Sequence, residues 1–130
     1  MIPRTREPSV LVVSRNVETV ESLRQYLTGA GIETAGGDSM EALAKHKPRR
    51  GRTGLVLFPD DFPLDAVDRE ISAIDRRAPR STVVLVTSTP KRFADRAGAK
   101  LVVLPRPAWA WAILDAINGR LDDTAGGADL

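Results

Sequence analysis

The chain has 130 residues, of which 42% are hydrophobic and 28% are charged, and this composition is typical of one globular domain with its own core. It contains no cysteine, which excludes disulfides, thiolate zinc sites and cysteine nucleophiles. No apolar run approaches the roughly 18 residues needed to cross a bilayer, and no apolar segment follows the charged N-terminus. We therefore expect a cytoplasmic protein without a membrane partner.

The formal net charge of +2 is too small to indicate a polyanionic partner by itself. Positive charge is nevertheless concentrated in KHKPRRGR at 45–52, which we interpret as a solvated loop. A nucleic-acid interface would need aromatic stacking residues or a groove-reading helix nearby, and the sequence indicates neither. His46 has no second histidine and no cysteine to share a metal with, so no metal site and no nucleic-acid partner are predicted.

Residues 1–8 are expected to be a flexible N-terminus. The first apolar run, SVLVV at 9–13, shows no alternation and predicts a strand covered on both faces. A helix is predicted over 17–31, with Asn16 as its N-cap and glycines at its end. Spacings of three and four place four apolar residues on one face of it: Val17, Val20, Leu23 and Leu27. IETA at 32–35 is a weak strand candidate.

A second helix is predicted in GGDSMEALAKHK, where Asp38 and Glu41 have the spacing of a capping box. TGLVLF at 53–58 is the next strongly apolar strand, and a helix over 64–77 follows it. The apolar face of that helix consists of residues at helical spacing: Val67, Ile71 and Ile74.

STVVLVTS at 81–88 predicts a third buried strand, and the polar segment after it has room for only a short helix. LVVLP at 101–105 is the fourth strong strand. A closing helix is predicted over 106–121, with Pro107 in its first turn, where a missing N–H costs nothing. The small, acidic residues 122–130 indicate a disordered tail or the stump of a linker.

Strands and helices thus alternate five times, which predicts an α/β fold with a parallel sheet and helices on both faces. In such folds the working site lies at the carboxyl ends of the strands. The loops there are SRN, PDDFP, TSTP and PRP. They contain no phosphate-binding glycine loop and no nucleophile elbow, so we do not expect an enzyme, and we predict no cofactor.

Over residues 9–121 the chain resembles the receiver domain of two-component response regulators. The resemblance rests on VLVVSRNVETVESLRQYLTGAGIET, on GLVLFPDDFP and on AGAKLVVLPRP, in this order and spacing. It implies a flavodoxin-like (βα)5 fold, with a doubly wound parallel five-stranded sheet in the order 2-1-3-4-5, and a role in phosphorelay signalling. The segment between Thr87 and Ala97 is about one turn shorter than is usual in the family, so a shortened fourth helix is expected.

At most of the positions that bind Mg²⁺ or accept the phosphoryl group in receivers, this chain has residues that cannot do so. The acidic pair that holds Mg²⁺ in receivers falls on Ser14 and Arg15, and the phosphoryl-accepting aspartate falls on Pro59. The hydroxyl position falls on Thr87, and the lysine position falls on Arg106, beside the proline that receivers also have there, Pro107. Mg²⁺ needs oxygen ligands that usually include carboxylates, and proline has no nucleophile. The resemblance is therefore to a degenerate pseudo-receiver, in which ordinary phosphorylation is expected to be lost.

The sequence allows several interpretations of Asp60 and Asp61, which follow Pro59. One of them could act as a shifted phosphoryl acceptor in an atypical phosphorelay, although Pro59 restricts the backbone just before them. One could instead form an ion pair with Arg15 or Arg106 and close the pocket. They could also be a solvated loop. If both carboxylates face away, the two arginines could bind a small anion, which would make the chain an anion or small-molecule sensor.

The closing helix contains AWAWA, which places Trp109 and Trp111 roughly 200° apart around a helix. Both cannot face the core, so at least one indole is expected to be exposed, either as a partner-binding residue or partly covered by a loop. In receivers, the face built from the fourth helix, fifth strand and fifth helix commonly carries partner or dimer contacts. The sequence therefore predicts a phosphorylation-independent interaction module that docks a protein, or a second copy of itself, on that face.

Overall fold

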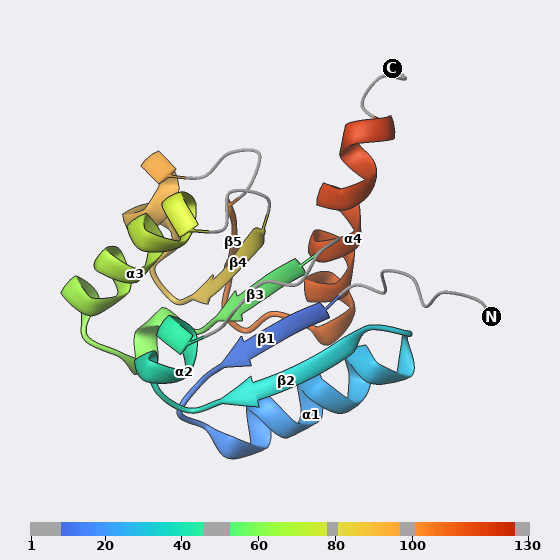
Figure 1. The fold of residues 1–130 in the computed structure, drawn as a ribbon, viewed down its shortest axis with the longest axis horizontal. Helices are drawn as coiled ribbons and strands as arrows, with labels where there is room; N and C mark the ends of the chain where they lie inside the picture. The colour runs from blue at the N-terminus through green and yellow to red at the C-terminus, as the bar shows by residue number, and fades with distance from the viewer. Residues whose placement is uncertain (1–8, 46–52, 78–80, 97–100, 127–130) are drawn as a thin grey trace.

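The computed structural model describes residues 9–45, 53–77, 81–96 and 101–126 (Figure 1). The expectations for the N-terminus at 1–8, for the basic segment with His46 and for the end of the tail at 127–130 lie outside the described residues. In the described part of the chain, no helix is long and apolar enough to span a membrane.

Five parallel strands form one sheet in the order β2-β1-β3-β4-β5, which confirms the predicted topology. They are β1 (Ser9–Val13), β2 (Glu33–Gly37), β3 (Thr53–Leu57), β4 (Thr82–Thr87) and β5 (Leu101–Pro105). The two strands with the strongest apolar runs, β3 and β4, are buried along their whole length. Such runs form central strands because both faces of the sheet are covered by helices.

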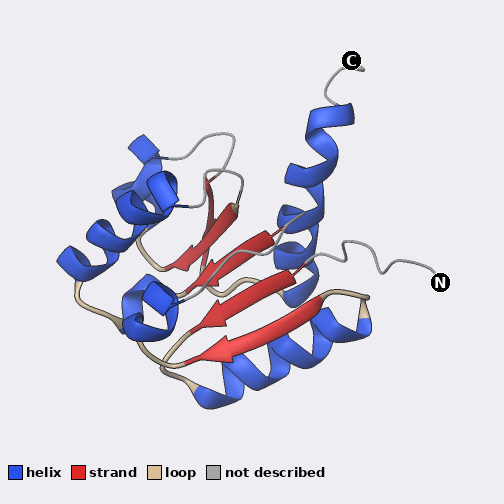
Figure 2. Cartoon of the chain, in the orientation of Figure 1, coloured by secondary structure: helices blue, strands red, loops and turns tan. Residues whose placement is uncertain are grey.

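The helices lie in two layers around the sheet (Figures 1 and 2). One core cluster joins the sheet to α1 (Val17–Gly29) and α4 (Ala110–Gly126). The other joins it to α2 (Met40–Lys45), α3 (Leu64–Arg77) and the 3₁₀ segment η2 (Pro90–Arg96). Alternate strand residues point to opposite faces. The fold is thus the doubly wound α/β arrangement expected from the alternating sequence pattern.

Helix α1 begins as predicted, because Asn16 Oδ1 accepts hydrogen bonds from the N–H groups of Glu18 (3.0 Å) and Thr19 (3.2 Å). Leu23 and Leu27 of its predicted apolar face are buried. Val17 is not; it is 70% exposed, which corrects the prediction that it faces the core. The residue of α1 that packs on Gly36 of β2 is Val20, whereas Val17, the first residue of the helix, lines a groove at the surface.

The cap of α2 also differs from the prediction. The helix begins at Met40, and the Oγ atom of Ser39 accepts a hydrogen bond from the Ala42 N–H at 3.3 Å. Ser39 therefore takes the N-cap position that the sequence analysis assigned to Asp38. In α3, by contrast, the predicted core residues are buried: Val67, Ile71 and Ile74.

The segment predicted to hold a shortened fourth helix is the 3₁₀ segment η2, anchored by Phe93, which is almost fully buried. The closing helix is therefore α4, and it begins at Ala110 and not at Pro107. The backbone of Arg106 still pairs with the sheet, since its N–H donates to the Thr87 carbonyl at 3.0 Å, and the first helical hydrogen bonds are accepted by the carbonyl of Trp109. The helix continues to Gly126, into the segment predicted to be a tail.

Candidate functional site at the carboxyl edge of the sheet

The carboxyl ends of four strands bring most of the predicted site residues to one edge of the sheet. Ser14 follows β1, and Thr87 ends β4. A single 3₁₀ turn, η1 (Pro59–Asp61), follows β3 and carries both aspartates. Arg106 follows β5. Because parallel strands end at the same edge, these side chains meet although they are far apart in the sequence.

Asp60 is the centre of a hydrogen-bond network. Its Oδ1 atom accepts the hydroxyl proton of Thr87 at 2.6 Å. Its Oδ2 atom accepts from both the N–H and the hydroxyl of Ser88, each at 2.9 Å. Arg106 Nη1 lies 3.5 Å from the same oxygen, which is the aspartate–arginine ion pair that one of the interpretations of the sequence expected. Both oxygens of Asp60 are thus bound by groups of the chain itself.

The surroundings of Asp60 also change its acidity. Partial burial raises the pKa of its carboxyl, but the hydrogen bonds from Thr87 and Ser88 and the positive charge of Arg106 act in the opposite direction. Together these interactions hold the pKa of Asp60 below its ordinary value. The network therefore stabilises the ionised carboxylate.

Asp61 points to a different strand end. Its Oδ2 atom accepts the hydroxyl proton of Ser14 at 2.7 Å and the backbone N–H of Arg15 at 3.0 Å. Ser14 Oγ in turn accepts from the Asn16 N–H at 3.1 Å, so Asp61 is linked to the start of α1. The Arg15 guanidinium lies over the ring of Phe62, 6.0 Å from its centroid. Arg15 therefore meets Asp61 through its backbone, whereas Arg106 meets Asp60 through its guanidinium.

Pro59 is buried and begins the 3₁₀ turn. The carbonyl of Phe58 accepts the N–H of Asp61, and the carbonyl of Pro59 accepts the N–H of Phe62, both at 3.1 Å. Proline suits this first position, because its fixed φ fits a turn and its missing N–H removes no bond there. The residue at the end of β3 therefore has a structural role in the turn, and it offers no nucleophile.

The residues present do not fit a Mg²⁺ ion. Ser14 supplies a neutral hydroxyl that already donates to Asp61, and the two carboxylates already accept hydrogen bonds from protein donors. Within the ranges that the structure describes, no group of three or more histidine, aspartate or glutamate side chains could hold a metal ion. Mg²⁺ demands near-octahedral oxygen coordination, which this donor set does not provide.

Ser88 and Phe58 contribute to this edge although no sequence motif predicted them. Ser88 gives Asp60 two hydrogen bonds, and the only signal for it was the run of hydroxyl residues that ends β4. Phe58 lies beneath the Arg106 guanidinium, whose central carbon is 5.7 Å from the ring centroid. Pro107, predicted to border this pocket, lies in the loop between β5 and α4.

Both tryptophans of the closing helix are exposed. Trp109 is 71% exposed and Trp111 is 57% exposed. Trp109 lies just before α4, where its carbonyl accepts the N–H groups of Ala112 (2.9 Å) and Ile113 (3.2 Å). The core-facing residues of the helix are instead Ile113 and Ile117, which are buried. This outcome satisfies the prediction that at least one indole is exposed.

No protein-family model matches the chain, and no curated protein matches its sequence. Solved structures do resemble it. A response regulator receiver protein from Sinorhizobium medicae superposes with a TM-score of 0.74 at 14% identity, over 89% of this chain and 95% of that one. The chain has the receiver fold.

Two further structures agree with this fold. The receiver domain of HemR from Leptospira biflexa gives a TM-score of 0.64 at 16% identity, over 88% of this chain and 94% of that one. The response regulator StyR gives a TM-score of 0.68 at 26% identity, over 92% of this chain and 62% of StyR. The receiver fold is thus matched over nearly nine-tenths of the chain or more.

Proposed function

We propose that this chain is a phosphorylation-independent signalling module, derived from a response-regulator receiver, that acts by binding a protein and not by catalysis. The likeness to receiver domains of response regulators supports the signalling context. The single observation that carries the proposal is Pro59: a buried proline begins the turn after β3, where the receiver mechanism needs a nucleophilic carboxylate.

Asp60 and Asp61 do not replace that nucleophile. A phosphoryl acceptor needs a carboxylate oxygen that can reach the donor, together with a metal ion that neutralises the transferring group. Both oxygens of Asp60 and the Oδ2 atom of Asp61 already bind donors of the chain. Attack by Asp60 would break its bonds to Thr87 and Ser88, so the geometry argues against a shifted acceptor.

The surface proposed to bind a partner is formed by Trp109, Trp111 and the neighbouring edge of the sheet. β5 is an edge strand, and its three central residues are only partly buried. Exposed indoles are costly in water and are enriched where a rigid ring enters the pocket of a partner. The partner is a protein, or a second copy of the chain, that docks on η2, β5 and α4.

The absence of phosphorylation is tested by intact-mass measurement after incubation with Mg²⁺ and acetyl phosphate. An unrelated receiver that takes up phosphate under these conditions serves as the positive control. We expect no phosphoryl adduct on this chain. An adduct that disappears in Asp60→Asn or Asp61→Asn would overturn the proposal and assign an atypical phosphorelay receiver.

The interaction surface is tested separately, by affinity capture from the native cells with the wild type and with the double variant Trp109→Ala/Trp111→Ala. We expect a partner that the double variant no longer retains. Sedimentation of the purified protein distinguishes self-association from a different partner. Equal capture by both proteins, with equal sedimentation, would show that the tryptophan surface is not the interface.

A further inference from the structure

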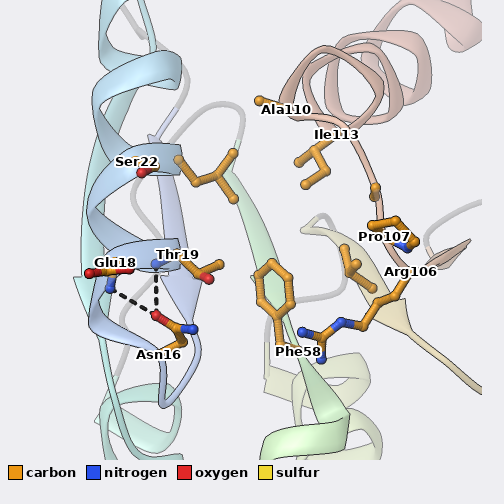
Figure 3. Close-up of a pocket in the computed structure, with 12 residues that line it drawn as sticks. Asn16, Glu18, Thr19, Ser22, Phe58, Arg106, Pro107, Ala110 and Ile113 are labelled. Atoms are coloured by element: carbon orange, nitrogen blue, oxygen red, sulfur yellow. Dashed lines mark hydrogen bonds between the residues drawn. The ribbon is translucent and has the colours of Figure 1, made fainter.

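A groove lies between the first half of α1 and the start of α4, beside Arg106 (Figure 3). Its volume is about 440 Å³, within the range of small-molecule sites. Its apolar lining consists partly of side chains that are almost fully buried in the core: Leu23, Phe58, Val86 and Ile113. The groove is thus a gap in the α1–α4 side of the core that opens at the carboxyl edge of the sheet.

The groove exists because small side chains face each other across it. Thr19 and Ser22 line it from α1, and Ala108 and Ala110 line it from the α4 side. In this stretch of sequence the large residues are the two tryptophans, and both are exposed instead. Leucine-sized side chains at these positions would fill the groove, whereas the small side chains leave it open.

Arg106 supplies the charge at one end of the groove. Its guanidinium lies over Phe58 and reaches the groove in Figure 3. The contact with Asp60 Oδ2 is 3.5 Å, which is longer than the usual N–H···O distance of about 2.7–3.2 Å. Among the described residues Asp60 is the one carboxylate paired with Arg106, so most of the five guanidinium N–H donors stay available.

The opposite wall, formed by the start of α1, adds polar side chains, and Glu18 is among the residues that line the groove there. Asn16 uses its Oδ1 atom to cap α1, which leaves its amide NH₂ as a donor. Figure 3 shows the Glu18 side chain on the side of α1 that faces away from Arg106. The groove therefore combines an apolar floor with a cation at one end, which is the composition of a site for an acid with an apolar body.

We propose that this groove binds a small organic acid, whose acid group pairs with Arg106 and whose apolar body packs on Phe58 and Ile113. An acid group that binds the available N–H donors of Arg106 shares the guanidinium with Asp60. Ligand binding would therefore change the contact between Arg106 and Asp60 and, through Asp60, the hydrogen bond to Thr87. The inference does not depend on the tryptophan surface, and it holds whether or not that surface binds a partner.

The test is a titration followed by ¹H–¹⁵N NMR, with phenylacetate and hexanoate as acids and phenylacetamide as the uncharged counterpart. We expect saturable shifts at the backbone amides of residues that line the groove, such as Thr19, Phe58 and Ala110. The amide counterpart should bind at least about tenfold more weakly, since it cannot form the charge-assisted bond.

Two variants remove different parts of the site. Arg106→Gln removes the cation and should weaken acid binding about tenfold or more. Ala110→Leu fills the groove and should abolish binding, with no change in the charge at position 106. Arg15→Gln is the matched control, because the Arg15 guanidinium also lies over a ring, that of Phe62, yet does not line the groove. The Arg15→Gln variant should bind the acid as tightly as the wild type does.

The outcomes decide between clear alternatives. Shifts confined to Trp109 and Trp111, or no saturable shift at all, would overturn the site. Equal binding of acid and amide, or full binding by Arg106→Gln, would overturn the assignment of the ligand as an acid. If Arg106→Gln does not fold, Ala110→Leu still decides, because binding retained in that variant places the ligand elsewhere.

Discussion

Thr87 donates its hydroxyl proton to Oδ1 of Asp60 over 2.6 Å, and this bond joins the end of β4 to the turn that follows β3. The Thr87 side chain is fully buried, and its Oγ1 atom also accepts the N–H of Thr89 at 3.0 Å. A buried hydroxyl that loses its acceptor costs stability. Asp60 therefore stabilises this edge of the sheet, independently of any ligand that binds there.

The first prediction concerns this bond. Asp60→Ala should lower the free energy of unfolding by about 1–3 kcal/mol, because it leaves the Thr87 hydroxyl and the Ser88 N–H without their acceptor. Urea denaturation followed by circular dichroism measures the change. Asp65→Ala is the control: its carboxylate is 83% exposed and lies 3.8 Å from Arg69, so its loss should change stability by less than about 0.5 kcal/mol. Equal midpoints for the two variants would contradict the role given to Asp60.

The second prediction is the pH dependence of that stabilisation. The folded-state pKa of Asp60 is lowered, so its contribution is fully present above the ordinary carboxyl pKa of about 4 and is lost as the pH falls through the lowered folded-state pKa. The stability difference between the wild type and Asp60→Asn should therefore be constant near neutral pH and shrink in acid. Denaturation curves at a series of pH values measure it, and a ¹³C NMR titration of the carboxyl group checks the pKa directly. A difference that grows in acid would reverse the assigned sign.

The third prediction concerns the packing of α1 on β2. A Cβ atom at Gly36 would overlap the Cγ1 atom of Val20, whose β-branched side chain has one strongly preferred rotamer in a helix. Gly36→Ala should therefore destabilise the protein by about 1–3 kcal/mol. Gly29→Ala is the control, since nothing lies within 4 Å of its added Cβ at the end of α1. That variant should be neutral or more stable by up to about 1 kcal/mol. Thermal unfolding of both proteins decides the point.

The fourth prediction separates folding from binding at the tryptophans. Because Trp109 and Trp111 are largely exposed, the double alanine variant should unfold within about 0.5 kcal/mol per site of the wild type. Its loss of partner binding should then not reflect loss of structure. Chemical denaturation followed by circular dichroism measures the stability without using the indoles as probes. A much larger destabilisation would mean that the rings support the fold, and the interaction surface would have to be sought elsewhere.

Much of the fold could be predicted from the sequence because buried strands and helix faces show local patterns of apolar residues. The unbroken apolar runs of β3 and β4 predicted central parallel strands, and the helical spacing of Val67, Ile71 and Ile74 predicted the buried face of α3. Val17 has the same spacing and is nevertheless exposed, because β2 is contacted by Val20, one turn further along α1, while Val17 stays at the surface. Periodicity identifies a face, but only the packing partner decides whether each position on that face is covered.

The sequence by itself determined that a proline follows the third apolar run, that two carboxylates follow the proline and that two arginines flank the edge. Only the tertiary structure decided which carboxylate meets which group. Successive residues of a 3₁₀ turn point about 120° apart, so Asp60 faces Thr87 and Arg106 while Asp61 faces Ser14 and the first loop. The groove beside Arg106 was likewise beyond prediction, because a hollow depends on the distance between two helices and not on the residues of either one.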